Sequence, residues 1–530
     1  VFARPFAAAI REAGLASVMN AYNELDGVPC AVSKEVLTDL LRGQLGFQGF
    51  VASDYFAIET AFSYHHVSTD LQGAGVQAIR AGLDLELPTT AAYGSLLVDA
   101  VRKGLVDIAT IDSSVRRVLE AKFRLGLFER PYVDVDKIQE VFNRPENKAI
   151  SYIVAAKSMT LLKNEGSLLP LKKDLKSIAI IGPNADSVRN LLGDYTYVPQ
   201  IEGLVSVMLA GAEALELEMD PGKMAHVAEY FMTEFRDVFQ AGHEDELALN
   251  NYVMRSILQS IRSVVSEETE VTYAKGCSIR GDAKDGFEDA VAAAKGAEVA
   301  ILVLGGKSGL DPTATRGETR DRASLQLPGV QQELLEAVYA AGTPVVLVLV
   351  NGRPLSIAWA AEHVPAILEA WVPGTEGGTA VADVLFGNAV PGGKLPISVP
   401  RDVGQVPVYH YHKPSGGRSQ LYGDYVERSS KPLYPFGFGL SYTEFEYSNL
   451  RISNSRVDSK GAVEISCDVT NVGAVAGDEV VQLYLHDRGA TITRPVQELV
   501  GFGRISLEPG ETCTVTFTVK MNQLGFYNRD

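Results

Sequence analysis

The 530-residue sequence has few cysteines and no long hydrophobic run, and each absence excludes a class of protein. Its four cysteines, Cys30, Cys277, Cys467 and Cys513, are too few and too scattered for a disulfide framework or a cysteine-rich zinc site. We expect free thiols, with one disulfide as the alternative. The longest obvious apolar run, Val345–Val350, has the length of a strand, whereas a membrane-spanning helix needs roughly 18–20 apolar residues. The sequence therefore predicts no membrane span.

Basic residues are scarce relative to acidic ones, since 48 lysines and arginines stand against 66 aspartates and glutamates, for a formal net charge of −18. Nucleic acid is not an expected partner, because binding it needs a basic surface. Hydrophobic residues make up 46% of the chain and charged residues 22%, an ordinary globular balance. At about 100–200 residues per domain, the length predicts three or four domains.

Several motifs that mark enzyme classes are missing. There is no Gly-x-x-x-x-Gly-Lys-Ser/Thr loop and no Gly-x-Ser-x-Gly elbow, so nucleotide hydrolysis and serine esterase chemistry both lack their usual marker. The pairs His65–His66 and His410 with His412 have no companion cysteine or acid cluster at ligand spacing. We therefore expect neither a metal nor a cofactor.

The first third of the chain alternates predicted strands and helices. Such alternation indicates βα units on a parallel sheet. The predicted strands cover residues 15–21, 47–53 and 83–87, and the predicted helices cover residues 33–45, 70–81 and 93–103. A complete (β/α)8 barrel needs about 250 residues, so residues 1–130 predict only the C-terminal part of such a barrel. The amphipathic pattern of residues 1–13 does not fit a signal peptide, and because the chain begins with Val1 we expect it to start inside a longer protein, with no cellular location assigned.

A second α/β domain is predicted over residues 176–402, after a linker at 131–175. Its strands at 178–182, 299–304 and 345–350 are nearly continuous runs of Val, Ile and Leu, which is typical of a parallel sheet covered on both faces. A helical insert spans about 205–268. Its Met and aromatic residues recur at helical spacing and predict a packed face, with a partner-binding surface as the alternative. They are Met224, Tyr230, Phe231, Met232, Phe235 and Phe239.

The last part of the chain changes character. After a second linker at 403–440, strands at 463–469, 479–485 and 513–519 alternate with turns. This pattern predicts a C-terminal β-sandwich over residues 441–530. The fold class is therefore α/β multidomain, with a partial barrel, an α/β sandwich with a parallel sheet, and a β-sandwich.

Two acids are candidate catalytic residues. Asp54 ends an apolar strand, and parallel barrels keep their catalytic groups at the carboxyl ends of strands. The alternative is that Asp54 caps the next helix. Glu318 lies in the run Arg316-Gly-Glu-Thr-Arg-Asp-Arg322, within a long loop after a buried strand. The three arginines of that run would lower carboxylate pKa values or bind an anion, and the alternative is a solvated charged loop.

A series of short motifs runs along nearly the whole chain, the helical insert excepted. The first is SVMNAYNELDGVP at residues 17–29. The others are LTDLLR at 37–42, GFQGF at 46–50, SDY at 53–55, AGLDLELP at 81–88, LLKN at 161–164, NGRP at 351–354, PGGKLP at 391–396 and YPFGFGLSY at 434–442. In their fixed order these motifs resemble glycoside hydrolase family 3, and the first is similar to the family segment S-V-M-x-x-Y-N-x-x-x-G-x-P.

The resemblance implies a retaining, exo-acting β-glycosidase that removes terminal β-linked glucose or xylose from oligosaccharides or glycosides. It implies a barrel, a six-stranded α/β sandwich and a fibronectin type III-like domain. By motif position, Asp54 corresponds to the nucleophile and Glu318 to the acid/base. Tyr22 matches a tyrosine that flanks the nucleophile, and Tyr55 replaces the tryptophan more usual there, so the surface on which the sugar stacks is altered.

Alternatives follow from what the chain lacks. The family's early barrel strands carry sugar-binding residues that are absent here, so we expect either a fragment or a barrel half supplied by another chain, a homo-oligomer included. An open half-barrel exposes apolar strand faces, which predicts poor solubility or low activity. The second candidate function is therefore a truncated, catalytically silent homologue that binds carbohydrate or a partner. A hexosaminidase or phosphorylase of the same family would use a histidine acid, against which the Glu318 loop argues.

Overall fold

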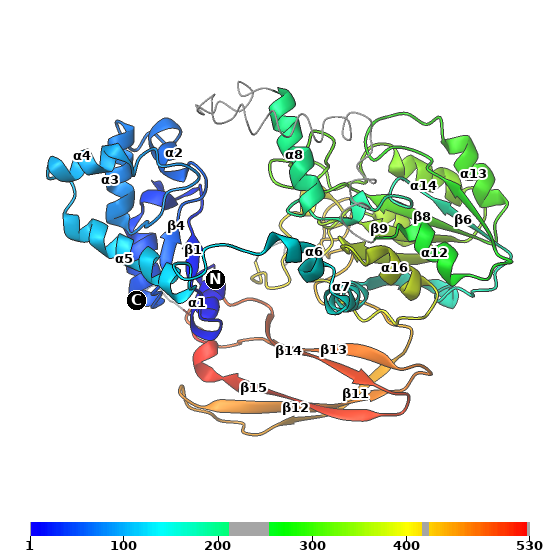
Figure 1. Cartoon of the computed structure of the whole chain (residues 1–530). Helices are drawn as coiled ribbons and strands as arrows, with labels where there is room; N and C mark the ends of the chain where they lie inside the picture. Colours follow the sequence, from blue (N-terminus) through cyan, green and yellow to red (C-terminus); the bar gives the residue numbers. More distant parts are fainter. Residues whose placement is uncertain (1, 211–253, 416–422, 527–530) are drawn as a thin grey trace. The chain divides into compact units, whose positions relative to one another are not determined.

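The computed structural model describes residues 2–210, 254–415 and 423–526, which divide into two units, Val1–Gln139 and Glu140–Asp530 (Figure 1). The predicted helical insert lies mostly outside the described residues, together with its Met and aromatic positions from Met224 to Phe239. All four cysteines are within the described residues and are free thiols, as the sequence predicts.

The first unit contains a short parallel sheet surrounded by helices. Strands β1 (Ser17–Met19) and β4 (Phe50–Ala52) pair in parallel, with Val18 opposite Val51. Leu83, Phe47 and Val51 are buried in the core beneath them. The other elements of this unit are α1 (Ala3–Glu12), β2 (Glu24–Leu25), β3 (Val28–Pro29), η1 (Cys30–Val32), η2 (Glu35–Gln44), α2 (Ala57–Ser63), α3 (Leu71–Ala81), α4 (Ser95–Arg102), α5 (Ile108–Arg124) and η3 (Val135–Lys137).

Local sequence signals explain several of these boundaries. Asp70 caps α3, since its carboxylate accepts from the Gly73 N–H at 2.6 Å, and Gly82 ends the helix at φ 103°. Oγ of Ser33 accepts from the Val36 N–H at 3.3 Å at the start of the helix predicted over residues 33–45. In the structure this helix is η2, a π-helix.

The predicted strand at 83–87 is wrong. In the structure this segment makes one parallel bridge, from Leu85 to Ala52, and is not a strand. Backbone hydrogen bonds join this segment to β4 around the bridge, from the Ser53 N–H to the Leu85 carbonyl and from the Leu85 N–H to the Val51 carbonyl. On either side of the bridge a side chain interrupts the ladder: the Val51 N–H donates to the Asp84 carboxylate at 2.8 Å. The Leu87 N–H donates to Oγ of Ser53, also at 2.8 Å. The segment still holds the end of β4 in position.

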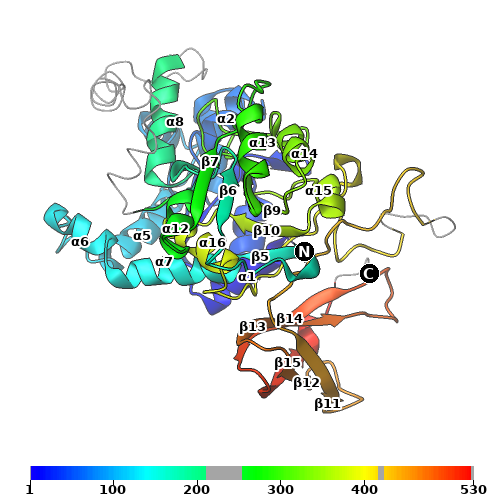
Figure 2. The same ribbon diagram turned by 90° about the vertical axis from the view of Figure 1, so that its right-hand side faces the viewer.

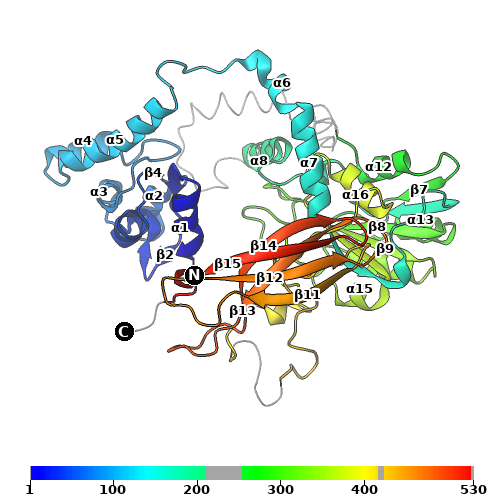
Figure 3. The ribbon, with the colours of Figure 1, turned by 90° about the horizontal axis from the view of Figure 1, so that it is seen from below.

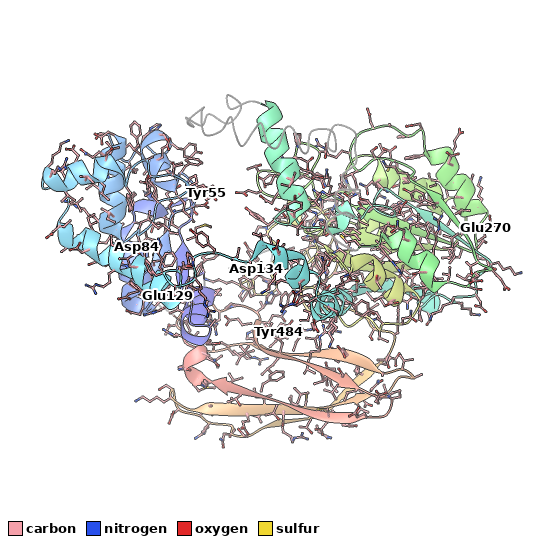
Figure 4. All side chains as sticks on the ribbon, in the orientation of Figure 1. Tyr55, Asp84, Glu129, Asp134, Glu270 and Tyr484 are labelled. Atoms are coloured by element: carbon pink, nitrogen blue, oxygen red, sulfur yellow. The ribbon has the colours of Figure 1, made fainter. Side chains whose placement is uncertain are left out.

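Asp84 is the centre of a buried polar cluster behind β4 (labelled in Figure 4). Its carboxylate is fully buried and pairs with Arg42 at 2.7 Å and with Arg117 at 2.6 Å. Ser114 of α5 donates to the same carboxylate at 2.7 Å. A buried carboxylate costs much free energy unless hydrogen bonds and opposite charge compensate it, and here both do. The cluster joins η2, α5 and β4, and so fixes the strand that carries Asp54.

The second unit is built on a six-stranded sheet in the order β5-β10-β9-β8-β6-β7, in which only β5 runs antiparallel to its neighbour. Side chains of β8 (Val299–Gly305) alternate between two cores, Val299, Ile301 and Val303 on one face and Ala300, Leu302 and Leu304 on the other. The remaining strands are β5 (Thr160–Asn164), β6 (Ser177–Ile181), β7 (Glu270–Ala274), β9 (Val345–Val350) and β10 (Ala366–Trp371).

Helices cover both faces of this sheet, as Figure 2 shows. Helices α7 (Pro145–Ser158), α8 (Tyr197–Ala210), α12 (Ile257–Val264) and α16 (Gly377–Leu385) contribute to one core, and α13 (Phe287–Lys295), α14 (Gln331–Tyr339) and α15 (Ala358–His363) to the other. The short helices of this part are α6 (Ile138–Phe142), η4 (Glu165–Ser167), η5 (Arg189–Leu191) and η7 (Val403–Gln405). The segment predicted as a linker at 131–175 contains α7 and β5, so part of it belongs to this layer structure.

Five strands form the C-terminal β-sandwich, seen from below in Figure 3. One sheet is β11 (Phe445–Ile452), β12 (Ala462–Asn471) and β15 (Thr512–Lys520), and the other is β13 (Gly477–Leu485) and β14 (Glu498–Leu507), followed by η8 (Met521–Gln523). Salt bridges join the sandwich to the α/β layer, from Lys157 to Asp478 at 3.1 Å and from Lys394 to Glu479 at 3.2 Å. The fold class is as predicted, and the remaining domain boundaries stay predictions.

Candidate active site

Asp54 lies two residues after β4, beyond the carboxyl end of that strand. Its N–H donates to Oδ1 of Asn20 at 3.1 Å, and Asn20 directly follows β1, so the ends of the two parallel strands are tied together. Its Oδ1 accepts from the Tyr55 N–H at 2.7 Å. The alternative of a helix cap is wrong, because Phe56 is the N-cap of α2 and no side chain caps it. The Asp54 carboxylate is half-buried.

Tyr22 and Tyr55 flank this carboxylate (Tyr55 is labelled in Figure 4). The Tyr22 hydroxyl donates to the backbone O of Tyr55 at 2.8 Å, and the Tyr22 carbonyl lies 2.9 Å from Nε2 of His65. The Tyr22 ring is 42% exposed and the Tyr55 ring 56%. The structure thus brings together three of the four predicted site residues, with two accessible aromatic surfaces beside one acid.

Glu318 lies in the second unit, on the loop at 305–327 that follows β8. In the strand order, β8 and β7 lie on opposite sides of β6, so the carboxyl ends of β6 and β8 form the switch point at which open α/β sheets bind ligands. Glu318 is exposed, and Oε2 accepts from the Tyr195 hydroxyl. The structure therefore supports a defined position for Glu318 rather than a freely solvated loop.

The loop folds back on itself just before Glu318. The Gly309 N–H donates to the Arg316 carbonyl at 3.1 Å, and the Thr315 N–H donates to the Lys307 carbonyl at 2.9 Å. Gly317 has φ 123°, and a Cβ there would lie 2.3 Å from the Gly309 carbonyl oxygen. Only glycine fits this close approach.

The segment Asn351-Gly352-Arg353, directly after β9, holds the loop on both sides of Glu318. On one side, a Cβ at Gly352 would lie 2.1 Å from Nη1 of the buried Arg316. On the other, Nη2 of Arg353 donates to the Arg320 carbonyl at 3.3 Å. Both contacts are two residues from Glu318, so the segment restrains the loop on either side of that acid.

Glu369 on β10 is buried beneath this segment. Its Oε2 accepts from Nδ2 of Asn351 and its Oε1 from the Trp371 N–H, both at 3.1 Å. Burial raises the pKa of Glu369 to about 8, although these hydrogen bonds and Arg316 oppose the shift. Burial likewise lowers the pKa of Arg316 to about 10. The residues that support Glu318 therefore include two ionisable groups held away from water.

The residues that hold the two acids were not singled out in the sequence. Asn20 and Arg353 follow strands, Glu369 lies within one, and Asp84 lies beside β4. For Asn20, Asp84 and Glu369, a polar residue within an apolar run is a usable signal. A sequence does not show which backbone groups such side chains reach.

Neither histidine pair forms a metal site in the structure. His66 Nδ1 lies 3.1 Å from the Phe62 carbonyl, His410 stacks on Phe436, and His412 Nδ1 lies 2.9 Å from the Lys413 carbonyl. In the described part of the chain, no group of three or more His, Cys, Asp or Glu side chains could hold a metal ion. Within the same residues, no helix combines the length and apolarity needed to cross a membrane.

Three family models match the sequence. The model of the glycosyl hydrolase family 3 C-terminal domain matches residues 159–442, and that of the family's N-terminal domain matches residues 1–121. The chain belongs to glycosyl hydrolase family 3. A fibronectin type III-like domain model matches residues 479–530 of this family 3 chain.

Curated relatives resemble the family 3 chain along its whole length. A β-xylosidase of Formosa agariphila is 37% identical over 537 residues, which is 100% of this chain and 67% of that protein. A periplasmic β-glucosidase of Salmonella typhimurium is 34% identical, over 98% of this chain and 64% of that protein. The chain thus spans about two thirds of the length of these relatives.

Solved structures show the same relationship. A β-glucosidase from Erythrobacter marinus superposes with a TM-score of 0.83 at 34% identity, over 99% of this chain and 65% of that one. A β-glucosidase from Listeria innocua in complex with isofagomine superposes with a TM-score of 0.81 at 31% identity, over 99% of this chain and 66% of that one.

Proposed function

We propose that this chain forms the part of a retaining, exo-acting β-glycosidase that carries both catalytic carboxylates, and that its substrate is a glycoside or oligosaccharide ending in β-linked glucose or xylose. The observation that carries the proposal is the similarity of the chain, from end to end, to proteins named β-xylosidase and β-glucosidase. The two candidate acids, one after a strand and one on an anchored loop, fit the chemistry of such an enzyme.

Asp54 is the proposed nucleophile. A retaining glycosidase needs one carboxylate that attacks the anomeric carbon and forms a covalent glycosyl-enzyme. Such a group has to stay fixed while the sugar moves toward it. The hydrogen bond from the Asp54 N–H to Asn20 and the turn closed by the Tyr55 N–H support this role, since they restrain the residue from both sides.

Glu318 is the proposed acid/base. It would protonate the departing glycosidic oxygen and then, once ionised, remove a proton from the water that releases the sugar. The Tyr195 hydroxyl donates to Oε2 and so stabilises the ionised form that the second step needs. The backbone contacts around Gly317 support this role, because an acid/base has to hold its carboxyl group in a fixed orientation toward the glycosidic oxygen.

Tyr22 and Tyr55 are the proposed sugar-binding residues. Their rings are exposed beside Asp54, and the apolar face of a pyranose packs well on an aromatic ring. The Tyr22 hydroxyl donates a hydrogen bond to the Tyr55 carbonyl, and this bond fixes the positions of the two residues relative to each other.

Trapping of the covalent intermediate tests this function. The protein is incubated with 2,4-dinitrophenyl 2-deoxy-2-fluoro β-glucoside and, separately, with the β-xyloside, and its peptides are analysed by mass spectrometry. We expect the mass of one fluoro-sugar on the peptide that contains Asp54, with the faster of the two reagents identifying the preferred sugar. Labelling at another acid would refute the assignment of Asp54, and the Asp54→Asn variant is the matched control. Absence of labelling by both reagents would favour the catalytically silent alternative.

A further inference from the structure

A cleft rich in arginine adjoins Glu318 in the second unit. Its volume is about 420 Å³, which is sufficient for a small ligand. Three arginines line it, and they come from two places: Arg280 lies after β7, and Arg320 and Arg322 lie on the loop that carries Glu318. Thr319, the immediate neighbour of Glu318, is also part of the lining.

The positive charge of this cleft is not neutralised within the part of the chain that the structure describes. There, Asp321 is the one carboxylate that lines the cleft, and none of the three arginines has an acidic oxygen within 4.0 Å. Arg280 donates to the Pro312 carbonyl at 2.6 Å, and Nε of Arg320 donates to the Leu310 carbonyl at 2.9 Å. Carbonyl oxygens orient a guanidinium and leave its charge in place.

The arginines also repel one another. Burial lowers the pKa of Arg322, and the neighbouring cations Arg353 and Arg280 lower it further. Such a group is stabilised by an anion, because an opposite charge favours the charged form. The whole chain carries a net charge of −18, so the positive charge of the cleft is local and opposite in sign to the net charge of the chain.

We propose that this arginine cleft binds an anionic group, a carboxylate or a sulfate, carried by the glycoside on which Glu318 acts. A guanidinium binds both groups through two parallel hydrogen bonds, and the cleft offers several such donors. That the anion belongs to a glycoside on which Glu318 acts rests on the proposed function; binding of the anion itself does not. An acidic sugar or an acidic leaving group would bring this charge with the substrate, whereas a free inorganic anion would bring it alone.

Direct binding tests the site without any need for turnover. The full chain is titrated by calorimetry with methyl β-glucuronide, with methyl β-glucoside and with sodium sulfate. We expect methyl β-glucuronide to bind about tenfold more tightly than methyl β-glucoside at low salt, with the difference shrinking as salt is added. Arg280→Gln and Arg322→Gln should each weaken glucuronide binding roughly fivefold or more, while Arg280→Lys should keep most of it.

Arg262→Gln on α12 is the matched control, because it removes one exposed positive charge elsewhere in the same unit. If all three glutamine variants weakened glucuronide binding equally, the net charge of the protein would account for the binding, and the proposal would be overturned. Binding of sulfate with no preference for methyl β-glucuronide would overturn the assignment to substrate and leave a site for free anions.

Kinetics then separates this inference from the proposed function. The β-glucoside of 4-hydroxybenzoate is compared with the β-glucoside of its methyl ester, and the ratio of the two kcat/KM values is followed across the variants, so that intrinsic leaving-group effects cancel. We expect the ratio to fall about fivefold in Arg280→Gln and Arg322→Gln and to stay constant in Arg262→Gln. A constant ratio in an active enzyme would overturn the inference alone. Loss of hydrolysis of both glucosides in the unmodified protein would refute the proposed function, and the calorimetric result would still decide the anion site.

Discussion

Gly352 packs against the guanidinium of Arg316 so closely that a Cβ at position 352 would lie 2.1 Å from Nη1 and 3.3 Å from Cζ. Arg316 is only 5% exposed, so its guanidinium cannot move aside into solvent without leaving its buried position. The contact connects the end of β9 to the residue two positions before Glu318. It explains in physical terms why the run Asn351-Gly-Arg carries glycine at its centre.

Gly352→Ala should therefore displace Arg316 and, with it, the loop of Glu318. We expect a loss of about 1–3 kcal/mol in the free energy of unfolding, as for other overpacked sites, and a larger fall in kcat than rise in KM. Denaturation and steady-state kinetics on a nitrophenyl glycoside measure both. Gly489→Ala is the control, since a Cβ there meets no atom within 4 Å. Equal behaviour of the two variants would show that the contact with Arg316 has no such role.

Glu369→Gln should change how stability depends on pH. Burial raises the pKa of Glu369 to about 8, whereas an unfolded glutamate titrates near 4.3. Between these values the folded state holds a proton that the unfolded state has released, so the wild-type protein loses stability as pH rises through this window. The slope is at most about 1.4 kcal/mol per pH unit.

The Glu369→Gln variant lacks this titration, so its stability relative to wild type should improve from pH 5 to pH 8. Urea unfolding at both pH values measures the difference. Glu362→Gln, at an exposed position on α15, should show no such trend. A difference between wild type and Glu369→Gln that stays constant with pH would mean that Glu369 is ionised throughout.

Asp84→Asn should destabilise the first unit strongly. The change leaves Arg42 and Arg117 without their shared carboxylate, and the loss of one partner from a buried ion pair costs about 3–5 kcal/mol. Asp39→Asn is the matched control, because Asp39 pairs with Lys34 at the surface, where such pairs contribute about 1 kcal/mol or less. Chemical denaturation followed by circular dichroism compares the two; similar losses would contradict the structural role of the Asp84 cluster.

Tyr22→Phe should lower activity while the fold stays intact. It removes the hydrogen bond of the Tyr22 hydroxyl to the Tyr55 carbonyl, which we estimate at about 1 kcal/mol, or roughly a fivefold fall in kcat/KM. The control is Tyr132→Phe, a change in the same unit at a tyrosine that is 91% exposed. If kcat/KM of Tyr22→Phe were unchanged, the hydroxyl of Tyr22 would have no role in the active site.

The elements best predicted from the sequence are those whose signals lie within the element itself, as apolar runs or as capping residues. The strand at Val345–Val350 has the predicted bounds, because it is an unbroken apolar run. Asp70 and Gly82 mark the two ends of α3 by ordinary capping chemistry.

What the sequence did not predict depends on distant partners. Strand β7 (Glu270–Ala274) is short and mixed in polarity, and it is a strand because it pairs with β6, about 90 residues earlier in the chain. The segment at 83–87 has a strand-like alternation, yet the Asp84 side chain takes up one of the hydrogen bonds that a longer ladder would use, and the pairing is limited to a bridge at Leu85. For the same reason, the motif Asn351-Gly-Arg could be recognised in the sequence, but its contacts with Arg316 and Arg320 could not.

Azide rescue of Glu318→Ala tests whether Asp54 and Glu318 act on the same glycosidic bond. The dinitrophenolate of a dinitrophenyl β-glycoside leaves without being protonated, so Asp54 should still form the glycosyl-enzyme. This intermediate then persists, because the base that activates water is missing. Azide needs no base, and we predict that it accelerates turnover and yields the β-glycosyl azide, while Asp321→Ala on the same loop yields none. Turnover that azide does not accelerate would contradict the role of Glu318 as the acid/base, and an α-glycosyl azide as the product would contradict a covalent intermediate on Asp54.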